Sequence, residues 1–196
     1  EDQLYQAVAL MKGASTFSSP QRESKEQNKE RELTDVISLT DAGAAILFES
    51  KSIEIDEKYK DKKQSRLLRK VIDACNEALN QLEGATKKLR KGSVILNKEK
   101  EKVIINQPIK YIFAIAVIDD YRDTDGWSQT IDKVEALCNK HEIVINVMSI
   151  YDVHQTIRDS NSDANSFMEA LIERNQIMLR DRVINPKVNH RNLSIE

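Results

Sequence analysis

The chain has few of the residues that punctuate or cross-link a fold: two cysteines, three prolines and five glycines among 196 residues. Such low proline and glycine contents exclude a low-complexity chain. Cys75 and Cys138 lie far apart in amphipathic stretches, and neither has a second cysteine or a histidine at metal-ligand spacing. We therefore expect two reduced core thiols of an intracellular protein rather than a disulfide or a zinc site.

Long hydrophobic runs and a strong excess of one charge are also missing. No apolar stretch approaches the ~20 residues of a membrane span, and no signal peptide is visible, so we expect a cytoplasmic protein that does not contact a membrane. The net charge is only −2, which excludes a uniformly basic nucleic-acid binder and leaves only a local basic patch for that role. Because the sequence begins at Glu1 inside a helical pattern and without a methionine, we expect it to be cut from a longer protein.

The spacing of apolar residues predicts one α/β domain over residues 1–196, with helices flanking a mixed central sheet. The run over 109–119 is apolar at nearly every position, as in a central strand buried on both faces. In chain order we expect a helix over 1–12, a mobile polar loop over 18–32, hairpin strands over 33–39 and 44–55, a helix over 64–91, a short hairpin of 93–96 and 102–106, a strand over 109–119, a helix over 127–140, a strand over 142–150, and helices over 151–159 and 163–182.

The first hairpin contains the residues with chemical potential. If its turn is centred on Ala42, antiparallel partners have numbers that sum to 84, and Asp35 faces Glu49. Because side chains alternate along a strand, Glu49 and Lys51 then point to the same face as Asp35. Directly opposed side chains have Cβ atoms about 5 Å apart. A bulge in the turn would shift this register by one residue.

Two carboxylates at that separation repel each other unless a cation neutralises them. Mg²⁺ and Mn²⁺ prefer such hard oxygen ligands, so we expect a metal site formed by Asp35 and Glu49, with the backbone carbonyl of Ser50 as a further ligand. Lys51 would orient the attacking water or stabilise the transition state of phosphodiester hydrolysis. The alternative is a strand end whose charges simply reach solvent, because a Glu-x-Lys triplet is common. The pattern alone leaves both interpretations open.

The segment LTDVISLTDAGAAILFESKS resembles the signature of the PD-(D/E)XK, or restriction-endonuclease-like, nuclease superfamily. That resemblance implies an aspartate on one strand and a Glu-x-Lys on the next that together bind the metal. Thr34 stands where the signature has proline. Together with QLEGA and the stretch IYDVHQTI…SFMEALIERN, the segment is similar to uncharacterised bacterial proteins of this fold, so the resemblance spans most of the chain.

The resemblance also suggests residues outside the hairpin. A helix before the hairpin often supplies another acid, for which Glu1 and Asp2 are candidates. The helix after it sometimes carries a glutamine, here Gln81. The alternative is a structural role, in which Gln81 flanks the apolar face of its helix and makes a local hydrogen bond. The end of that helix is basic, and its cations either complement the helix dipole or contact nucleic-acid phosphates: Lys87, Lys88, Arg90 and Lys91.

We therefore predict a Mg²⁺- or Mn²⁺-dependent nuclease that acts on DNA in preference to RNA, with Asp35, Glu49, Lys51 and Gln81 as catalytic residues. The resemblance implies a setting in bacterial or phage defence, repair or mobile-element biology, and a homodimer or further domains are candidate partners. Two other functions stay open. The first is a catalytically inactive domain of the same fold that binds nucleic acid or protein, and the second is a structural module of a larger assembly.

Overall fold

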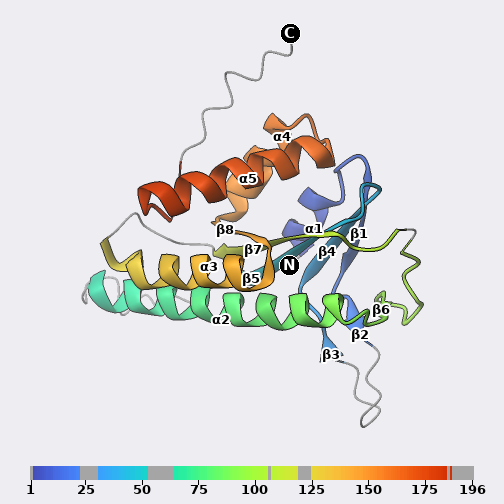
Figure 1. The fold of residues 1–196 in the computed structure, drawn as a ribbon, viewed down its shortest axis with the longest axis horizontal. Helices are drawn as coiled ribbons and strands as arrows, with labels where there is room; N and C mark the ends of the chain where they lie inside the picture. Colours follow the sequence, from blue (N-terminus) through green and yellow to red (C-terminus); the bar gives the residue numbers. More distant parts are fainter. Residues whose placement is uncertain are drawn as a thin grey trace.

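A five-stranded mixed sheet forms the centre of the protein (Figure 1). The computed structural model describes residues 2–22, 31–52, 64–105, 107–118, 125–184 and 186. Antiparallel pairing joins the first three strands of the sheet, whereas the last three run parallel, so the sheet changes type at its middle strand. Its order is β1 (Ala14–Ser18), β4 (Val36–Thr40), β5 (Ala44–Lys51), β7 (Tyr111–Ile118) and β8 (Val144–Met148).

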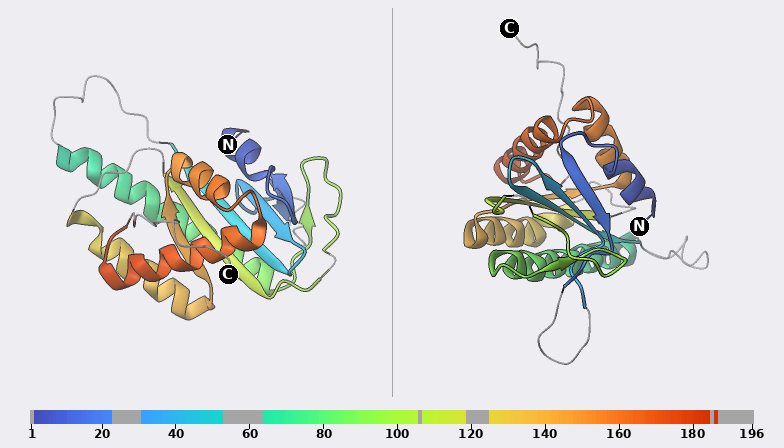
Figure 2. Two further views of the ribbon diagram at one scale, coloured as in Figure 1. Left: turned by 90° about the horizontal axis from the view of Figure 1, so that it is seen from above. Right: turned by 90° about the vertical axis from the view of Figure 1, so that its right-hand side faces the viewer.

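Helices cover both faces of this sheet, as Figures 1 and 2 show. One face packs against α2 (Gln64–Arg90) and α3 (Ser128–His141), and a short 3₁₀ helix, η2 (Asp125–Trp127), precedes α3. The other face packs against α1, α4 and α5, whose bounds are Asp2–Val8, Ile150–Asp159 and Ala164–Asp181. The expectation of an α/β protein with a mixed sheet between helices is therefore confirmed. None of the described helices is long and apolar enough to cross a membrane.

Alternation along β5 determines which residues meet which helical layer. Ala45 and Leu47 belong to the apolar cluster under α2 and α3, whereas Ile46 and Phe48 belong to the cluster under α1, α4 and α5. Odd-numbered residues of β5 therefore face α2, because successive side chains of a strand point to opposite faces. Continuing this alternation to the end of the strand at Lys51 places the charged end of β5 on the α2 side.

The long helix α2 forms because its apolar residues recur at helical spacing along one side. Val71, Cys75, Ala78, Leu82 and Leu89 are all buried beneath it. The helix ends at Arg90, and Gly92 follows in the left-handed conformation with φ +70°, a common helix C-terminal arrangement. The predicted helix over 64–91 is thus confirmed, and it crosses the sheet in contact with β5 and β7.

The register of the β4–β5 hairpin agrees with the sequence prediction. Leu39 pairs with Ala45 and Ile37 with Leu47, so paired residue numbers sum to 84. Gly43 closes the turn with φ +76° and donates its N–H to the carbonyl of Thr40. A Cβ atom at this position would lie 3.0 Å from the carbonyl oxygen of Pro108. Glycine is therefore required here for both backbone conformation and space.

The consequence is a matched pair of glycine substitutions. Gly43→Ala should lower the free energy of unfolding by more than Gly92→Ala, because both glycines have positive φ but a Cβ at Gly92 would meet nothing within 4 Å. The left-handed backbone alone costs about 1 kcal/mol, so the difference between the two variants reports the contact with Pro108. Urea unfolding of both variants measures it, and equal losses would show that the loop before β7 moves aside without cost.

The expectation of a loop over 18–32 was wrong in part, and the expected end of the second hairpin strand lies outside the described residues. Within the region predicted as loop, Ser18 ends β1, and short strands form at Gln21–Arg22 (β2) and Arg31–Glu32 (β3), while residues 23–30 lie outside the described part. β1 and β3 are edge strands, whereas β2 is the two-residue middle strand of the small sheet; strands this short and only half-buried leave no apolar alternation in the sequence. Residues 53–55, predicted to extend β5, also lie outside the described residues.

The predicted hairpin of 93–96 and 102–106 forms only as a turn. Strand β6 (Ile95–Leu96) pairs with β2 in a small three-stranded sheet of order β3-β2-β6. The chain does fold back after β6, with Val103 donating its N–H to the carbonyl of Ile95. The returning chain makes a single isolated β-bridge, between Leu96 and Lys102, so residues 102–105 do not form a strand. Residue 106 lies outside the described part.

Candidate metal and catalytic site

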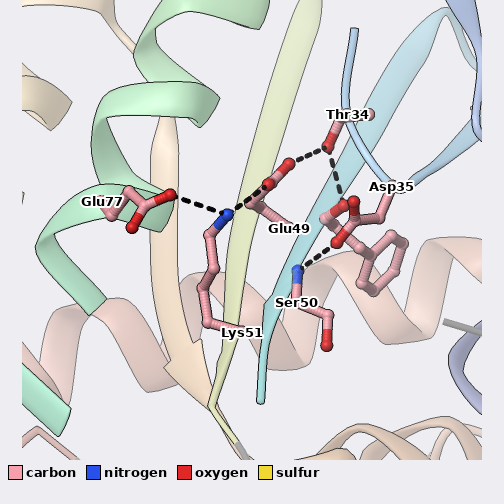
Figure 3. Close-up of polar contacts among 7 residues, drawn as sticks. Thr34, Asp35, Glu49, Ser50, Lys51 and Glu77 are labelled. Carbon is pink, nitrogen blue, oxygen red and sulfur yellow. Dashed lines mark hydrogen bonds and ion pairs between the residues drawn. The ribbon is translucent and has the colours of Figure 1, made fainter. Parts of the chain in front are cut away.

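The acidic end of the hairpin lies where β5 leaves the core. Glu49 is an odd-numbered residue of β5 and so follows Ala45 and Leu47 onto the face beneath α2 (Figure 3). Its side chain is only 5% exposed. The apolar strand AAILF, which packs well, therefore carries a carboxylate into a position that water reaches poorly. Removing an ionised carboxylate from water is costly unless it has a partner.

Asp35 lies one pair beyond the last paired residues of the hairpin, Val36 and Phe48. Its Oδ2 atom accepts a hydrogen bond of 2.6 Å from the backbone N–H of Ser50, and its own carbonyl accepts one of 2.7 Å from Ser19. The Asp35 side chain thus takes over from backbone pairing at the point where the two strands separate (Figure 3). This fixes the carboxylate beside the backbone of Glu49 and Ser50.

Thr34 braces the same end from within the core. Its side-chain oxygen lies 2.7 Å from the carbonyl oxygen of Phe48 and 3.3 Å from Oε2 of Glu49, and the residue is buried. One hydroxyl proton cannot serve both acceptors, so the shorter contact with Phe48 takes it. Thr34 therefore ties β4 to β5 and occupies the space on one side of the Glu49 carboxylate.

Lys51 approaches Glu49 from the opposite side. Its Nζ atom lies 3.3 Å from Oε1 of Glu49 and 3.2 Å from Oε1 of Glu77 on α2, and its side chain is 21% exposed. Burial disfavours the ammonium, but the hydrogen bonds and negative charges of Glu77 and Glu49 outweigh burial and hold the pKa of Lys51 above its usual value. Lys51 is therefore a charged group held between two carboxylates.

The protonation of Glu49 is strongly perturbed. Burial of its carboxyl group, and then the negative charge of Asp35, raise the pKa of Glu49 to about 7, against the lowering influence of Lys51 and Thr34. One positive charge is thus too little to neutralise the two carboxylates in this poorly hydrated position. A divalent cation would favour the ionised form of Glu49.

The donor atoms here fit Mg²⁺ or Mn²⁺. Among the described residues, no group of three or more histidine, cysteine, aspartate or glutamate side chains is arranged to hold a metal ion. Mg²⁺ needs no such group, because it commonly binds through one or two carboxylates and keeps waters or substrate oxygens as its other ligands. Asp35 and Glu49, with the Ser50 carbonyl between Glu49 and Lys51, supply hard oxygen donors of that kind.

Other predicted site residues are placed less favourably. Gln81 is exposed on α2, one turn beyond Glu77, and its side chain makes no hydrogen bond with any residue in the described part of the chain. Asp2 begins α1, which packs on the opposite face of the sheet from α2, while Glu1 lies outside the described residues. Gln81 thus stays a candidate, because it lies on the same side of the sheet as Glu49. Asp2 lies on the opposite side.

The predicted basic cluster lies at the far end of α2. Lys87 follows Glu77 by ten residues, or about 15 Å along a helix. Lys87 forms an ion pair of 2.9 Å with Glu83, and Arg90 donates to the carbonyls of His141 and Glu142 at the end of α3, each at 3.4 Å. These contacts favour the structural interpretation of Lys87 and Arg90, in which cations complement helix ends. Contact of this cluster with nucleic acid stays a prediction.

Glu77 and Thr34 are the members of this network that sequence patterns did not single out. Strand alternation predicts which residues of one hairpin share a face, but it cannot give the rotation of a helix that arrives from elsewhere in the chain. The signal for Glu77 was present: it is a polar residue two positions after Cys75 and one before Ala78, both buried in the face of α2 that packs on the sheet. A polar residue flanking that face can reach the end of β5.

Comparisons with known proteins do not assign the chain to a family. No protein-family model matches it, and neither the curated proteins nor the solved structures include a significant match.

Proposed function

We propose that this protein is a metal-dependent nuclease of the restriction-endonuclease-like type, which hydrolyses phosphodiester bonds of DNA in preference to RNA. The observation that carries the proposal is the meeting of Asp35, buried Glu49 and Lys51 at one end of the β4–β5 hairpin, with the pKa of Glu49 raised to about 7. Such perturbed groups concentrate at functional sites.

Each residue has a distinct part in this proposal. Asp35 and Glu49 would hold Mg²⁺ or Mn²⁺, and the Ser50 carbonyl would add a third oxygen. When bound, the cation supplies Lewis acidity to the scissile phosphate. Lys51, with its ammonium 3.3 Å from Glu49, would donate hydrogen bonds to the attacking water or to the oxygen on which negative charge develops. Gln81 would contact substrate or solvent near the same face.

The arrangement of elements supports the restriction-endonuclease-like fold in this proposal. A helix, α1, precedes the hairpin, and α2 follows it and crosses the sheet, as the resemblance implies. Strand β7 then pairs parallel to β5, so that the Glu-x-Lys strand is the middle strand of the sheet and its end at Glu49–Lys51 stays paired with β7. A rigid scaffold of this kind keeps catalytic groups in fixed relative positions.

The proposal is tested by incubating the protein with end-labelled single- and double-stranded DNA and RNA in Mg²⁺, in Mn²⁺ and in excess chelator. We expect cleavage of DNA that depends on the metal and stops with chelator. Absence of cleavage on every substrate, in a protein that binds Mn²⁺, would favour an inactive domain.

One observation favours that second candidate, a catalytically inactive domain that binds nucleic acid or protein. Asp35, Glu49 and Lys51 all have partners within the chain: Asp35 accepts from the Ser50 N–H, and Lys51 forms ion pairs with both Glu49 and Glu77. Such a network could persist as a purely structural element at the strand end. The nuclease requires the metal and the inactive domain does not, so failure to bind Mn²⁺ would also favour the inactive domain.

Asp35→Asn is expected to weaken Mn²⁺ binding about tenfold or more, from a Kd of about 1 mM or tighter, because a full negative charge beside the cation is lost. The amide oxygen can still accept the hydrogen bond from the Ser50 N–H, so the strand end should keep its shape. Titration calorimetry measures the affinity. Asp41→Asn, at the opposite end of the same hairpin, is the matched control and should bind like the wild type. Identical binding by Asp35→Asn would remove Asp35 from the site.

Replacing Lys87 and Lys88 together by glutamate should weaken DNA binding and flatten the dependence of log K on log salt, because fewer counterions are released. Each lost phosphate contact should reduce the slope by about 0.9. Lys12→Glu with Arg158→Glu makes the same charge change on the α1 and α4 layer and should leave the slope nearly unchanged. If the double variant kept the wild-type slope of log K against log salt, Lys87 and Lys88 would complement the helix dipole and make no contact with DNA.

A further inference from the structure

Glu77 is an acidic residue outside the hairpin that reaches the proposed site through Lys51. The Lys51 ammonium is nearly equidistant from two carboxylates, 3.3 Å from Oε1 of Glu49 and 3.2 Å from Oε1 of Glu77. The two acids differ in setting. Glu49 is 5% exposed on the sheet, whereas Glu77 is 64% exposed on α2, so only Glu77 has room to follow a moving partner (Figure 3).

Each oxygen of the Glu49 carboxylate has one polar neighbour. Oε2 lies 3.3 Å from the buried Thr34 hydroxyl, and Oε1 lies 3.3 Å from the Lys51 ammonium. An ammonium and a divalent cation that share one carboxylate oxygen repel each other. Without a second acceptor, Lys51 would compete with the metal for Glu49.

We propose that Glu77 is a positioning residue that holds the Lys51 ammonium off Glu49 when a divalent cation binds. This inference rests on the proposed function. Glu77 provides the alternative carboxylate, so that Lys51 can yield Oε1 of Glu49 and still stay beside the site. The helix that covers the sheet thus takes part in cation binding, although the ligands come from the hairpin.

The observed contacts favour action through Lys51 over direct coordination. Glu77 forms an ion pair with Lys51, and no hydrogen bond between Glu77 and Asp35 or Glu49 occurs among the described residues. A direct ligand would act whether or not Lys51 is present. A positioning residue loses its effect when the group that it positions is removed.

A double-mutant cycle separates these two actions. Mn²⁺ affinity is measured by titration calorimetry for the wild type, Glu77→Gln, Lys51→Ala and the double variant. We expect Glu77→Gln to weaken Mn²⁺ binding about three- to fivefold, the range of one partly exposed ion pair. In the Lys51→Ala background the same substitution should have no effect. Asp73→Asn, exposed one turn earlier on α2, removes the same charge and should bind like the wild type.

Three results would overturn the inference, and each points elsewhere. If Glu77→Gln binds Mn²⁺ like the wild type, Glu77 has no part in the site although the proposed function stands. Equal weakening in both backgrounds would make Glu77 a direct contributor to the cation site. If the wild type itself binds no Mn²⁺, the proposed function fails together with the role of Glu77. Thermal unfolding of each variant verifies that the fold is kept.

Discussion

Lys51→Ala is expected to reduce metal-dependent DNA cleavage by about 10²–10³-fold, the usual cost of losing one electrostatic contact with a developing charge. The reason is a division of tasks within the site. Asp35 and Glu49 carry oxygen atoms that can bind a cation, whereas a protonated Lys51 has no lone pair and acts on water or the transition state. Single-turnover cleavage at saturating Mg²⁺ measures the effect.

Two comparisons make this prediction specific. The variant should bind Mn²⁺ at least as tightly as the wild type, because a positive charge beside Glu49 is gone. Lys12→Ala, an exposed residue between α1 and β1, should cleave at the wild-type rate. If Lys51→Ala retained the wild-type rate, the activity would come from another site or from a contaminant, and Lys51 would have no catalytic part.

Glu49 should make the metal-free protein less stable as the pH rises. The pKa of Glu49 is about 7 in the folded protein and 4.5 in the unfolded chain, so the folded state binds more protons between these values. The free energy of unfolding should therefore fall as the pH rises from about 4.5 to about 7 and then level off. A rise in pKa of this size corresponds to about 3 kcal/mol of unfolding free energy.

Urea unfolding across pH 4–8 in chelator checks this dependence. Glu49→Gln, which cannot ionise, should lose it and be the more stable protein at pH 8, while Glu169→Gln on α5 should behave like the wild type. Saturating Mg²⁺ should raise the stability of the wild type at pH 8, because a ligand that binds only the folded state stabilises it. If the free energy of unfolding depended on pH in the same way for the wild type and for Glu49→Gln, folding would not raise the pKa of Glu49.

Local patterns were sufficient to predict the hairpin and its register. Strand alternation and a tight turn at Gly43 relate residues at most sixteen positions apart, so the pairing of Ile37 with Leu47 follows from spacing alone. The same holds for α2 and for β7, because a regular apolar face or an unbroken apolar run marks a buried element. Burial of Glu49 did not follow, because the sequence left open whether the charges at this strand end bind a metal or reach solvent, and the 5% exposure of its side chain is seen only in the structure.

Contacts between distant segments could not be predicted. Strand β1 at Ala14–Ser18 lies at the edge of the sheet and owes its form to pairing with β4, and β2 owes its form to pairing with β3 and with β6, which is more than seventy positions away. Such pairing needs backbone groups rather than side chains, so composition does not reveal it. The ion pair of Lys51 with Glu77 depends on the rotation and docking of α2, which the whole core determines.

Localisation of bound Mn²⁺ by paramagnetic broadening in ¹⁵N-labelled protein tests most directly whether the end of the β4–β5 hairpin is a metal site. Broadening should be strongest for the amides of Glu49, Ser50 and Lys51 and slightly weaker for the amide of Asp35. The double substitution Asp35→Asn with Glu49→Gln should abolish it. Broadening centred on another acidic surface, or unchanged by that double substitution, would contradict a metal site at Asp35 and Glu49.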